Sequence, residues 1–64
     1  MEDYQQRVVD EHAALSQKLS ELEDFFFSHG RSDLSAKEQA LLSAQIWAMV
    51  SYKGILEQRI ALFG

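Results

Sequence analysis

Residues 36–63 read AKEQALLSAQIWAMVSYKGILEQRIALF, and this stretch decides the fold. Apolar side chains recur in it every seven residues, with two more beside them: Leu42, Met49, Leu56 and Phe63, flanked by Tyr52 and Ile60. Residues seven apart lie on one face of an α-helix. The stretch therefore predicts a helix with one buried stripe.

A second stripe of small and apolar residues lies on roughly the opposite side of the same helix. It contains Ser43, Trp47, Val50, Gly54 and Ala61. A partner helix in the same chain can cover only the first stripe, and a Trp that faces water without reason is unusual. We therefore predict a homo-oligomer, from dimer to hexamer, with Trp47, Val50 and Gly54 at the interface.

The run Phe25–Phe27 adds to this expectation. Three successive aromatic residues on a helix cannot all face one partner. We interpret the run as partly buried in the core of the chain and partly in contact with another copy. Phe26 is assigned both to the oligomer interface and to the apolar row that faces the partner helix. A base-stacking platform is the alternative interpretation.

An earlier segment predicts the partner helix. Its apolar seam alternates spacings of four and three: Val8, His12, Leu15, Leu19, Leu22 and Phe26. Glu2 or Asp3 can cap its start, and Gly30 is placed for the left-handed residue that ends many helices. Ser35 and Glu38 have the spacing of a capping box for the next helix.

We thus predict an all-α fold and one domain, 1–64, in which an antiparallel two-helix hairpin (about 3–28 and 36–63) assembles into a homo-oligomeric helical bundle. Each helix would be roughly 40 Å long at 1.5 Å per residue. A domain of this size is marginally stable alone, and the chain has no cysteine for disulfides. Association is the remaining aid to stability.

Composition limits the function. The net charge is −4, and without a basic stripe we expect no binding to duplex DNA or RNA. No apolar run reaches the roughly 18 residues of a membrane span, and the polar start does not resemble a secretory signal. We therefore expect a cytoplasmic protein.

The sequence contains no pattern typical of catalysis or metal binding. The serines have no His–acid pair at usable spacing, and the three glycines are isolated. His12 in the seam predicts a packed imidazole bonded to one polar partner. We expect no enzyme activity, no cofactor and no metal site.

A strip of polar and aromatic side chains flanks the seam of the first helix. Tyr4, Arg7, Glu11, Lys18 and Phe25 fall within a sector of about 60°. An aromatic ring with cations is what a nucleotide needs, for stacking and for pairing with phosphate. The same strip also fits a solvated flank, in which Arg7 joins nearby acids and Tyr4 covers the end of the seam.

On the second helix, Lys53 precedes Glu57 by four residues, which favours a weak surface pair. Arg59 lies at the margin of the buried stripe. Its head could reach either solvent or a ligand between subunits. The pattern leaves both readings of Arg59 open.

The order Tyr4, Arg7, Val8, Glu11, Leu15, Lys18, Leu22, Phe25 and the later order Gln45, Met49, Tyr52, Leu56, Arg59, Ile60 carry a family resemblance. The chain resembles, over nearly its whole length, the small phage helical hairpins that include the anti-CBASS cyclic-oligonucleotide sponges and the N-terminal hairpin of the Thoeris anti-defence sponges.

The resemblance implies a non-catalytic decoy in the cytoplasm of the infected bacterial host. It would bind cyclic di- or trinucleotides between subunits and so deny the signal to a defence effector, a form of immune evasion. The resemblance assigns base stacking to Tyr4, phosphate binding to Lys18 and a hydroxyl donor to Ser20. Arg7 joins these candidate ligand residues from the polar strip described above. It assigns Arg59 to a separate trinucleotide site.

Two-fold pairing of the first helices would present two Tyr and two Lys to a ligand that is itself nearly two-fold symmetric. The alternative function is an oligomeric helical adaptor that binds a host protein through an exposed apolar helix face. The two differ in which surface stays open: the Tyr4 and Lys18 edge in a sponge, the Trp47 face in an adaptor.

Overall fold

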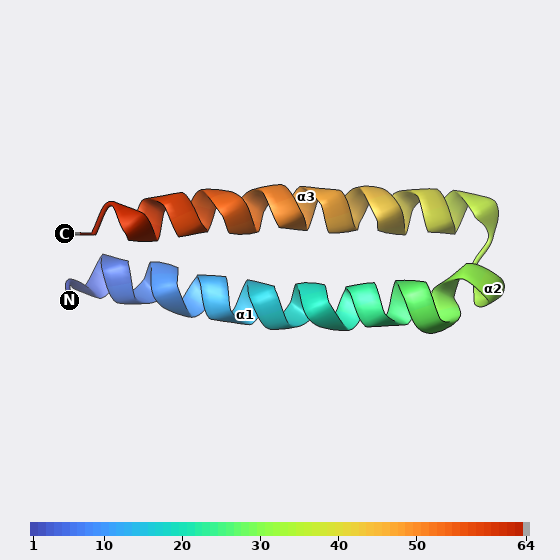
Figure 1. Ribbon diagram of the computed structural model, residues 1–64, viewed down its shortest axis with the longest axis horizontal. Helices are drawn as coiled ribbons and strands as arrows, with labels where there is room; N and C mark the ends of the chain where they lie inside the picture. Colours follow the sequence, from blue (N-terminus) through green and yellow to red (C-terminus); the bar gives the residue numbers. More distant parts are fainter. Residues whose placement is uncertain (64) are drawn as a thin grey trace.

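A computed structural model describes residues 1–63 of the chain, without the side chains of residues 29–31. Two long antiparallel helices dominate it, α1 (Asp3–Phe25) and α3 (Ala36–Ala61). Between them lie a π-helical turn, η1 (Phe26–Gly30), and a short helix, α2 (Arg31–Asp33). Both chain ends lie at the end of the hairpin away from α2 (Figure 1). The predicted antiparallel hairpin is thus confirmed; its assembly into an oligomer stays a prediction.

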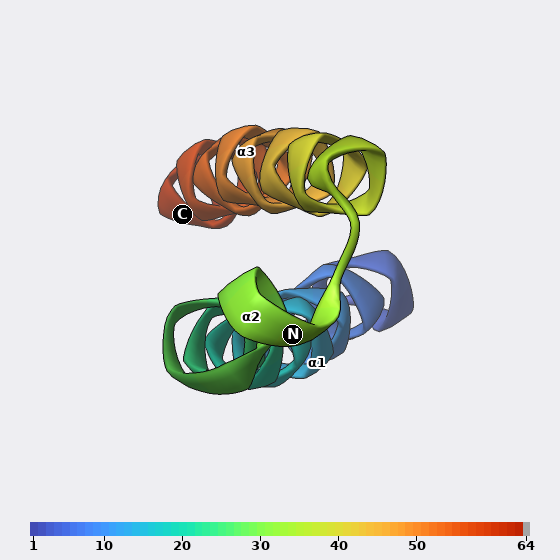
Figure 2. The ribbon, with the colours of Figure 1, turned by 90° about the vertical axis from the view of Figure 1, so that its right-hand side faces the viewer.

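The hairpin is a thin rod of 45 × 15 × 13 Å, close to the length expected from the sequence. Viewed along the rod, α1 and α3 cross at a small angle, with α2 lying at the turn (Figure 2). None of the described helices is both long enough and apolar enough to cross a membrane.

The continuous helical segment that begins with α1 extends further along the chain than predicted. We expected it to end near Ser28, with Gly30 left-handed, but Gly30 lies inside the π-helical turn and α2 continues to Asp33. The sequence has no proline, so no residue forces an end, and a glycine inside a helix costs only about 1 kcal/mol relative to alanine. The connection to α3 is therefore only Leu34 and Ser35.

The start of α3 shows one of the two bonds of the predicted capping box. Ser35 adopts an extended N-cap conformation, and its hydroxyl accepts a hydrogen bond from the Glu38 amide at 3.2 Å. Gln39 also donates to the Leu34 carbonyl at 3.0 Å, which holds the short connection against the helix. At the other start, Glu2 is the N-cap residue and its amide donates to the Gln5 side chain at 3.0 Å.

The core is a single seam between α1 and α3. Its buried cluster and the half-buried residues packed on it are Leu19, Phe26, Ile46 and Met49, with Leu15, Leu22 and Leu42. Leu56, further along, is fully buried. On α3 the seam follows a four-three spacing that includes Ile46, which the seven-residue pattern does not contain. Tyr52, which was predicted to lie beside the buried stripe, is 42% exposed.

Candidate functional site: two opposite edges of the hairpin

The hairpin has two long edges, one on each side of the buried seam. Contacts between the helices identify them. Tyr4 packs edge-on against Phe63, with ring centroids 5.9 Å apart, on one side. His12 bonds to Glu57 at 2.9 Å on the other, since Tyr4 and His12 lie about 40° to either side of the buried Val8 around α1.

The first edge carries most of the predicted ligand residues. Arg7 and Lys18 follow Tyr4 by three and fourteen residues, which keeps them within about 60° of it around α1. On α3, Tyr52 and Arg59 lie about 40° and 60° from the buried Leu56, on the side away from Glu57. We call this the cationic edge; it carries Tyr4, Arg7, Lys18, Tyr52 and Arg59, with the carboxylate of Glu11 in the same strip of α1, and all six side chains are exposed.

The three cations of this edge are available to an anion. The ion pair found between described side chains joins His12 to Glu57, and no carboxylate of residues 1–63 with a described side chain lies within ion-pair distance of Arg7, Lys18 or Arg59. The surface network considered for Arg7 therefore does not form within the described part of the chain. A phosphate would meet these cations without first breaking an ion pair.

Tyr4 is partly in contact with the rest of the chain and partly exposed. One side of its ring contacts Phe63 and covers the end of the seam, as one of the sequence interpretations expected. The ring nevertheless remains more than half exposed. It can therefore still stack on a base while the contact with Phe63 fixes its position.

The spacing of Tyr4 and Lys18 restricts the site. Fourteen residues of α-helix rise about 21 Å, which is too far for one small cyclic dinucleotide to contact both side chains of the same copy. Ser20 follows Lys18 by two residues, so it points to nearly the opposite side of α1. A site that uses these residues together must therefore draw them from more than one copy.

Tyr52 lies on the cationic edge, although it was not among the candidate ligand residues predicted from the sequence. The Tyr4–Phe63 and His12–Glu57 contacts set the register of the two helices and place Lys18 close to the level of Tyr52. The exposed ring of Tyr52 thus lies near Lys18 on the cationic edge. Tyr52 had been predicted to lie beside the buried stripe. The alternating steps of four and three from Leu42 to Leu56 pass through Lys53 and not through Tyr52, and this was the available signal.

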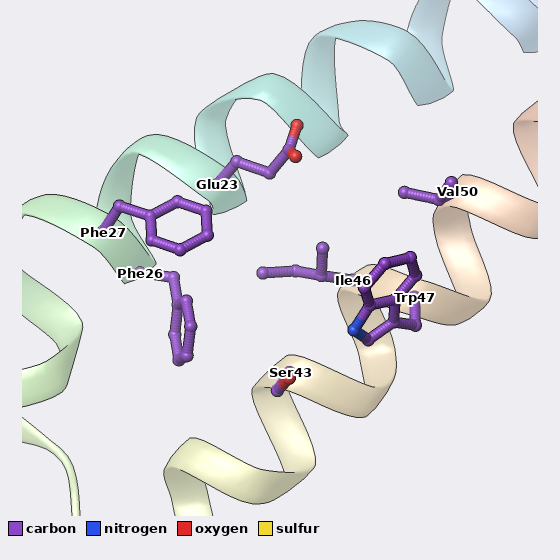
Figure 3. A pocket seen from close by; sticks show the side chains of 7 residues that line it. All are labelled: Glu23, Phe26, Phe27, Ser43, Ile46, Trp47 and Val50. Carbon is purple, nitrogen blue, oxygen red and sulfur yellow. The ribbon is translucent and has the colours of Figure 1, made fainter.

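The opposite edge contains an open apolar pocket of about 240 Å³. Its lining comes from both helices: Glu23, Phe26, Phe27, Ser43, Ile46, Trp47 and Val50. In Figure 3, Phe26 and Ile46 lie between the helices, with Glu23, Phe27, Trp47 and Val50 around them. We call this the pocket edge; it continues along α3 through Gly54 to the His12–Glu57 pair.

The predicted interface residues differ in burial. Trp47 is 69% exposed and Phe27 64%, whereas Phe26 is only 9% exposed because it packs in the seam and against Phe27. Gly54 is half-buried. Trp47, Val50 and Gly54 are thus on the surface where a second copy could reach them, and Phe26 could be reached only through the pocket.

His12 behaves as the sequence predicted. Its half-buried imidazole has one polar partner, the Glu57 carboxylate. The hydrogen bond from His12 lowers the pKa of Glu57, with smaller contributions from the charges of His12 and Lys53. Glu57 therefore bonds across the hairpin rather than in the expected pair with Lys53. Among described residues, no cluster of three or more His, Asp and Glu side chains could hold a metal ion.

Comparison with known proteins places the chain in a family. It is 43% identical over 60 residues, 94% of each chain, to a protein of Enterobacteria phage T4 named "Uncharacterized 7.5 kDa protein in denB-rIIB intergenic region". No solved structure matches. The family model called Sequestin matches residues 2–62, so the chain belongs to the Sequestin family.

Proposed function

We propose that this protein is a phage sponge that binds cyclic di- and trinucleotide second messengers inside the infected bacterium and keeps them from CBASS-type immune effectors. It would act without catalysis, by binding alone. The family name, Sequestin, supports a sequestering role, and the phage T4 relative supports a phage setting.

The observation that carries the proposal is the cationic edge. A chain with a net charge of −4 places Arg7, Lys18 and Arg59 on one edge with two exposed tyrosines. Phosphates of a cyclic nucleotide would accept charge-assisted hydrogen bonds from the cations, and its bases would stack on the rings. A duplex would need a far larger positive surface.

The length of the edge supports binding between subunits. Because Tyr4 and Lys18 of one copy are about 21 Å apart, the ligand would take Tyr4 from one copy and Lys18 from another. A two-fold pair of edges offers two such combinations. Ser20 and Arg59, which lie on opposite edges of one copy, would likewise meet only between copies.

Isothermal titration calorimetry against a panel of cyclic di- and trinucleotides tests the proposal. We expect saturable heat with at least one cyclic compound, and little with the matched linear dinucleotide, which lacks the closed shape and carries extra terminal groups. The Lys18→Ala protein is the matched control, because it should remain folded and lose the heat.

The adaptor is the second candidate, and the exposed Trp47 beside an open pocket is the observation that favours it. The same titrations decide between the two. No heat with any cyclic nucleotide, at protein concentrations that support an oligomer, would reject the sponge and leave the adaptor.

A further inference from the structure

A carboxylate lies in the middle of the cationic edge. Glu11 follows Tyr4 by seven residues and precedes Lys18 by seven, so the three side chains lie on one line along α1, within about 40° of one another. Glu11 is the single acid in the sector of about 60° that holds this strip. Its charge repels the phosphates that Arg7 and Lys18 would bind, so phosphate binding does not explain its position.

Glu11 has no partner within the described part of the hairpin. Arg7 lies one turn earlier on α1, and the register of the two helices places Arg59 of α3 at nearly the same level. Neither guanidinium is within ion-pair distance of the exposed Glu11 carboxylate, and no donor of the described residues bonds to its oxygens. A carboxylate is an acceptor of hydrogen bonds only. Glu11 can therefore accept donors that a ligand brings.

Helix geometry directs Glu11 toward the stacking ring. Each Cα–Cβ bond of an α-helix tilts toward the helix N-terminus, and Tyr4 lies on that side of Glu11. Seven residues of helix rise about 10.5 Å. A base stacked on Tyr4, a hydrogen bond and the reach of a glutamate side chain together fill that distance. The carboxylate thus lies at the edge of a base on Tyr4 rather than beside a phosphate on Lys18.

We propose that Glu11 selects guanine in the ligand, an inference that rests on the proposed sponge function. Guanine presents two donors side by side on its Watson–Crick edge, N1–H and the N2 amino group, and a carboxylate accepts both at once. Adenine presents one donor there, the N6 amino group, beside the N1 lone pair, which repels a carboxylate oxygen. Stacking on Tyr4 fixes the base, and Glu11 reads its edge.

A ribose hydroxyl is the other donor that a nucleotide could offer to Glu11. The ribose lies between the base and the phosphate, so a contact with it would bring the carboxylate closer to the phosphate charge. A contact with the far edge of the base keeps the two negative groups apart. The charges of the ligand therefore favour the base, and the two contacts predict different results for one substitution.

Calorimetry with cyclic di-GMP and cyclic di-AMP measures the preference. We expect the wild type to bind cyclic di-GMP about tenfold or more tightly than cyclic di-AMP, the discrimination that a good two-bond contact to a base gives. Glu11→Gln should shift the preference toward cyclic di-AMP, because the glutamine amide accepts from N6–H and donates to N1 of adenine. The cyclic dinucleotide of hypoxanthine, which lacks the N2 amino group, should bind the wild type more weakly than cyclic di-GMP.

Asp24→Asn is the matched control. It removes the same charge from an exposed position of α1 that points away from both the seam and the cationic edge. The preference for cyclic di-GMP should remain as in the wild type. Circular dichroism checks that Asp24→Asn and Glu11→Gln stay helical, as substitutions at exposed positions should.

Several results would overturn the proposal. Tighter binding of both nucleotides by Glu11→Gln, by the same factor, would show that Glu11 only repels phosphate. Equal weakening of both would assign the carboxylate to the ribose. A wild type that binds both nucleotides equally would reject guanine selection and leave the sponge standing. A wild type that binds no cyclic nucleotide would reject the sponge and guanine selection together.

Discussion

The imidazole of His12 on α1 is 2.9 Å from the carboxylate of Glu57 on α3, and this pair ties the two helices together on the pocket edge. Forty-five residues separate the two side chains in the sequence. The contact therefore depends on the hairpin being closed, and it makes the stability of the hairpin depend on pH.

Glu57→Gln should weaken the acid sensitivity of the hairpin. The pKa of Glu57 is lowered below its ordinary value of 4.5, mainly by the hydrogen bond from His12. A lowered carboxyl pKa means that the contribution to folding is complete above 4.5 and is lost as the pH falls through the folded-state pKa. Thermal melts followed by circular dichroism from neutral to strongly acidic pH measure this difference.

Wild type should have the higher melting temperature at neutral pH, and the melting temperatures of wild type and Glu57→Gln should converge in acid. Glu11→Gln, which removes a charge from the opposite edge, is the control and should not remove the pH-dependent difference. Melting temperatures of wild type and Glu57→Gln that stay parallel at every pH would show that the pair does not stabilise the fold.

Lys18→Ala should weaken ligand binding without harming the fold. A hydrogen bond to a charged group contributes roughly 1.5–3 kcal/mol, and a symmetric site would lose two, so the affinity should fall by about two orders of magnitude or more. Helix stability should be unchanged or slightly raised, because alanine is the better helix former. Calorimetry and melting curves give both values.

Salt provides the control for Lys18. Added salt screens exposed charges, so it should weaken ligand binding by the wild type more than ligand binding by Lys18→Ala. Unchanged cyclic-nucleotide affinity in Lys18→Ala would move the binding site along the cationic edge toward Arg59.

The two contacts of the Tyr4 ring, with a proposed base and with Phe63, can be tested separately. Tyr4→Ala should lose base stacking of about 1–3 kcal/mol per base and also the ring contact with Phe63. Tyr4→Phe keeps both and should bind nearly as well as the wild type. Phe63→Ala removes only the contact within the chain, so it should lower the melting temperature more than the affinity.

Leu56→Ala should unfold much of the population. Leu56 is 0% exposed, and replacing a buried leucine by alanine typically costs about 2–5 kcal/mol. A domain of this length has total stability of the same order. Urea titration followed by circular dichroism measures the loss. Leu41→Ala, a change at an exposed leucine, should shift stability by less than about 0.5 kcal/mol.

Local rules account for what the sequence predicted well. The cap at Ser35, the antiparallel helices and the single partner of His12 follow from spacing within a few residues or from one seam. The seven-residue rule missed Ile46, since a seam between two helices uses both the four- and the three-residue steps. Gly30 was read as a helix end, but the helical path continues through it.

The candidate site was less predictable than the fold. Periodicity placed Tyr4, Arg7 and Lys18 on one side of α1, and the structure agrees. The position of Arg59 on the same edge depends on the register of the two helices, which no local pattern determines. The contact of Tyr4 with Phe63 and the distance from Tyr4 to Lys18 likewise require both helices in three dimensions.

The two edges lie on opposite sides of the same thin rod, and this separation has an evolutionary consequence. A substitution at Lys18 or Arg59 changes a surface that Trp47 and Gly54 do not share. In the proposed sponge, ligand preference can therefore drift while the predicted contact through Trp47 and Gly54 is conserved. Comparing sequences of the Sequestin family should then show faster divergence at Lys18 and Arg59 than at Trp47, Val50 and Gly54.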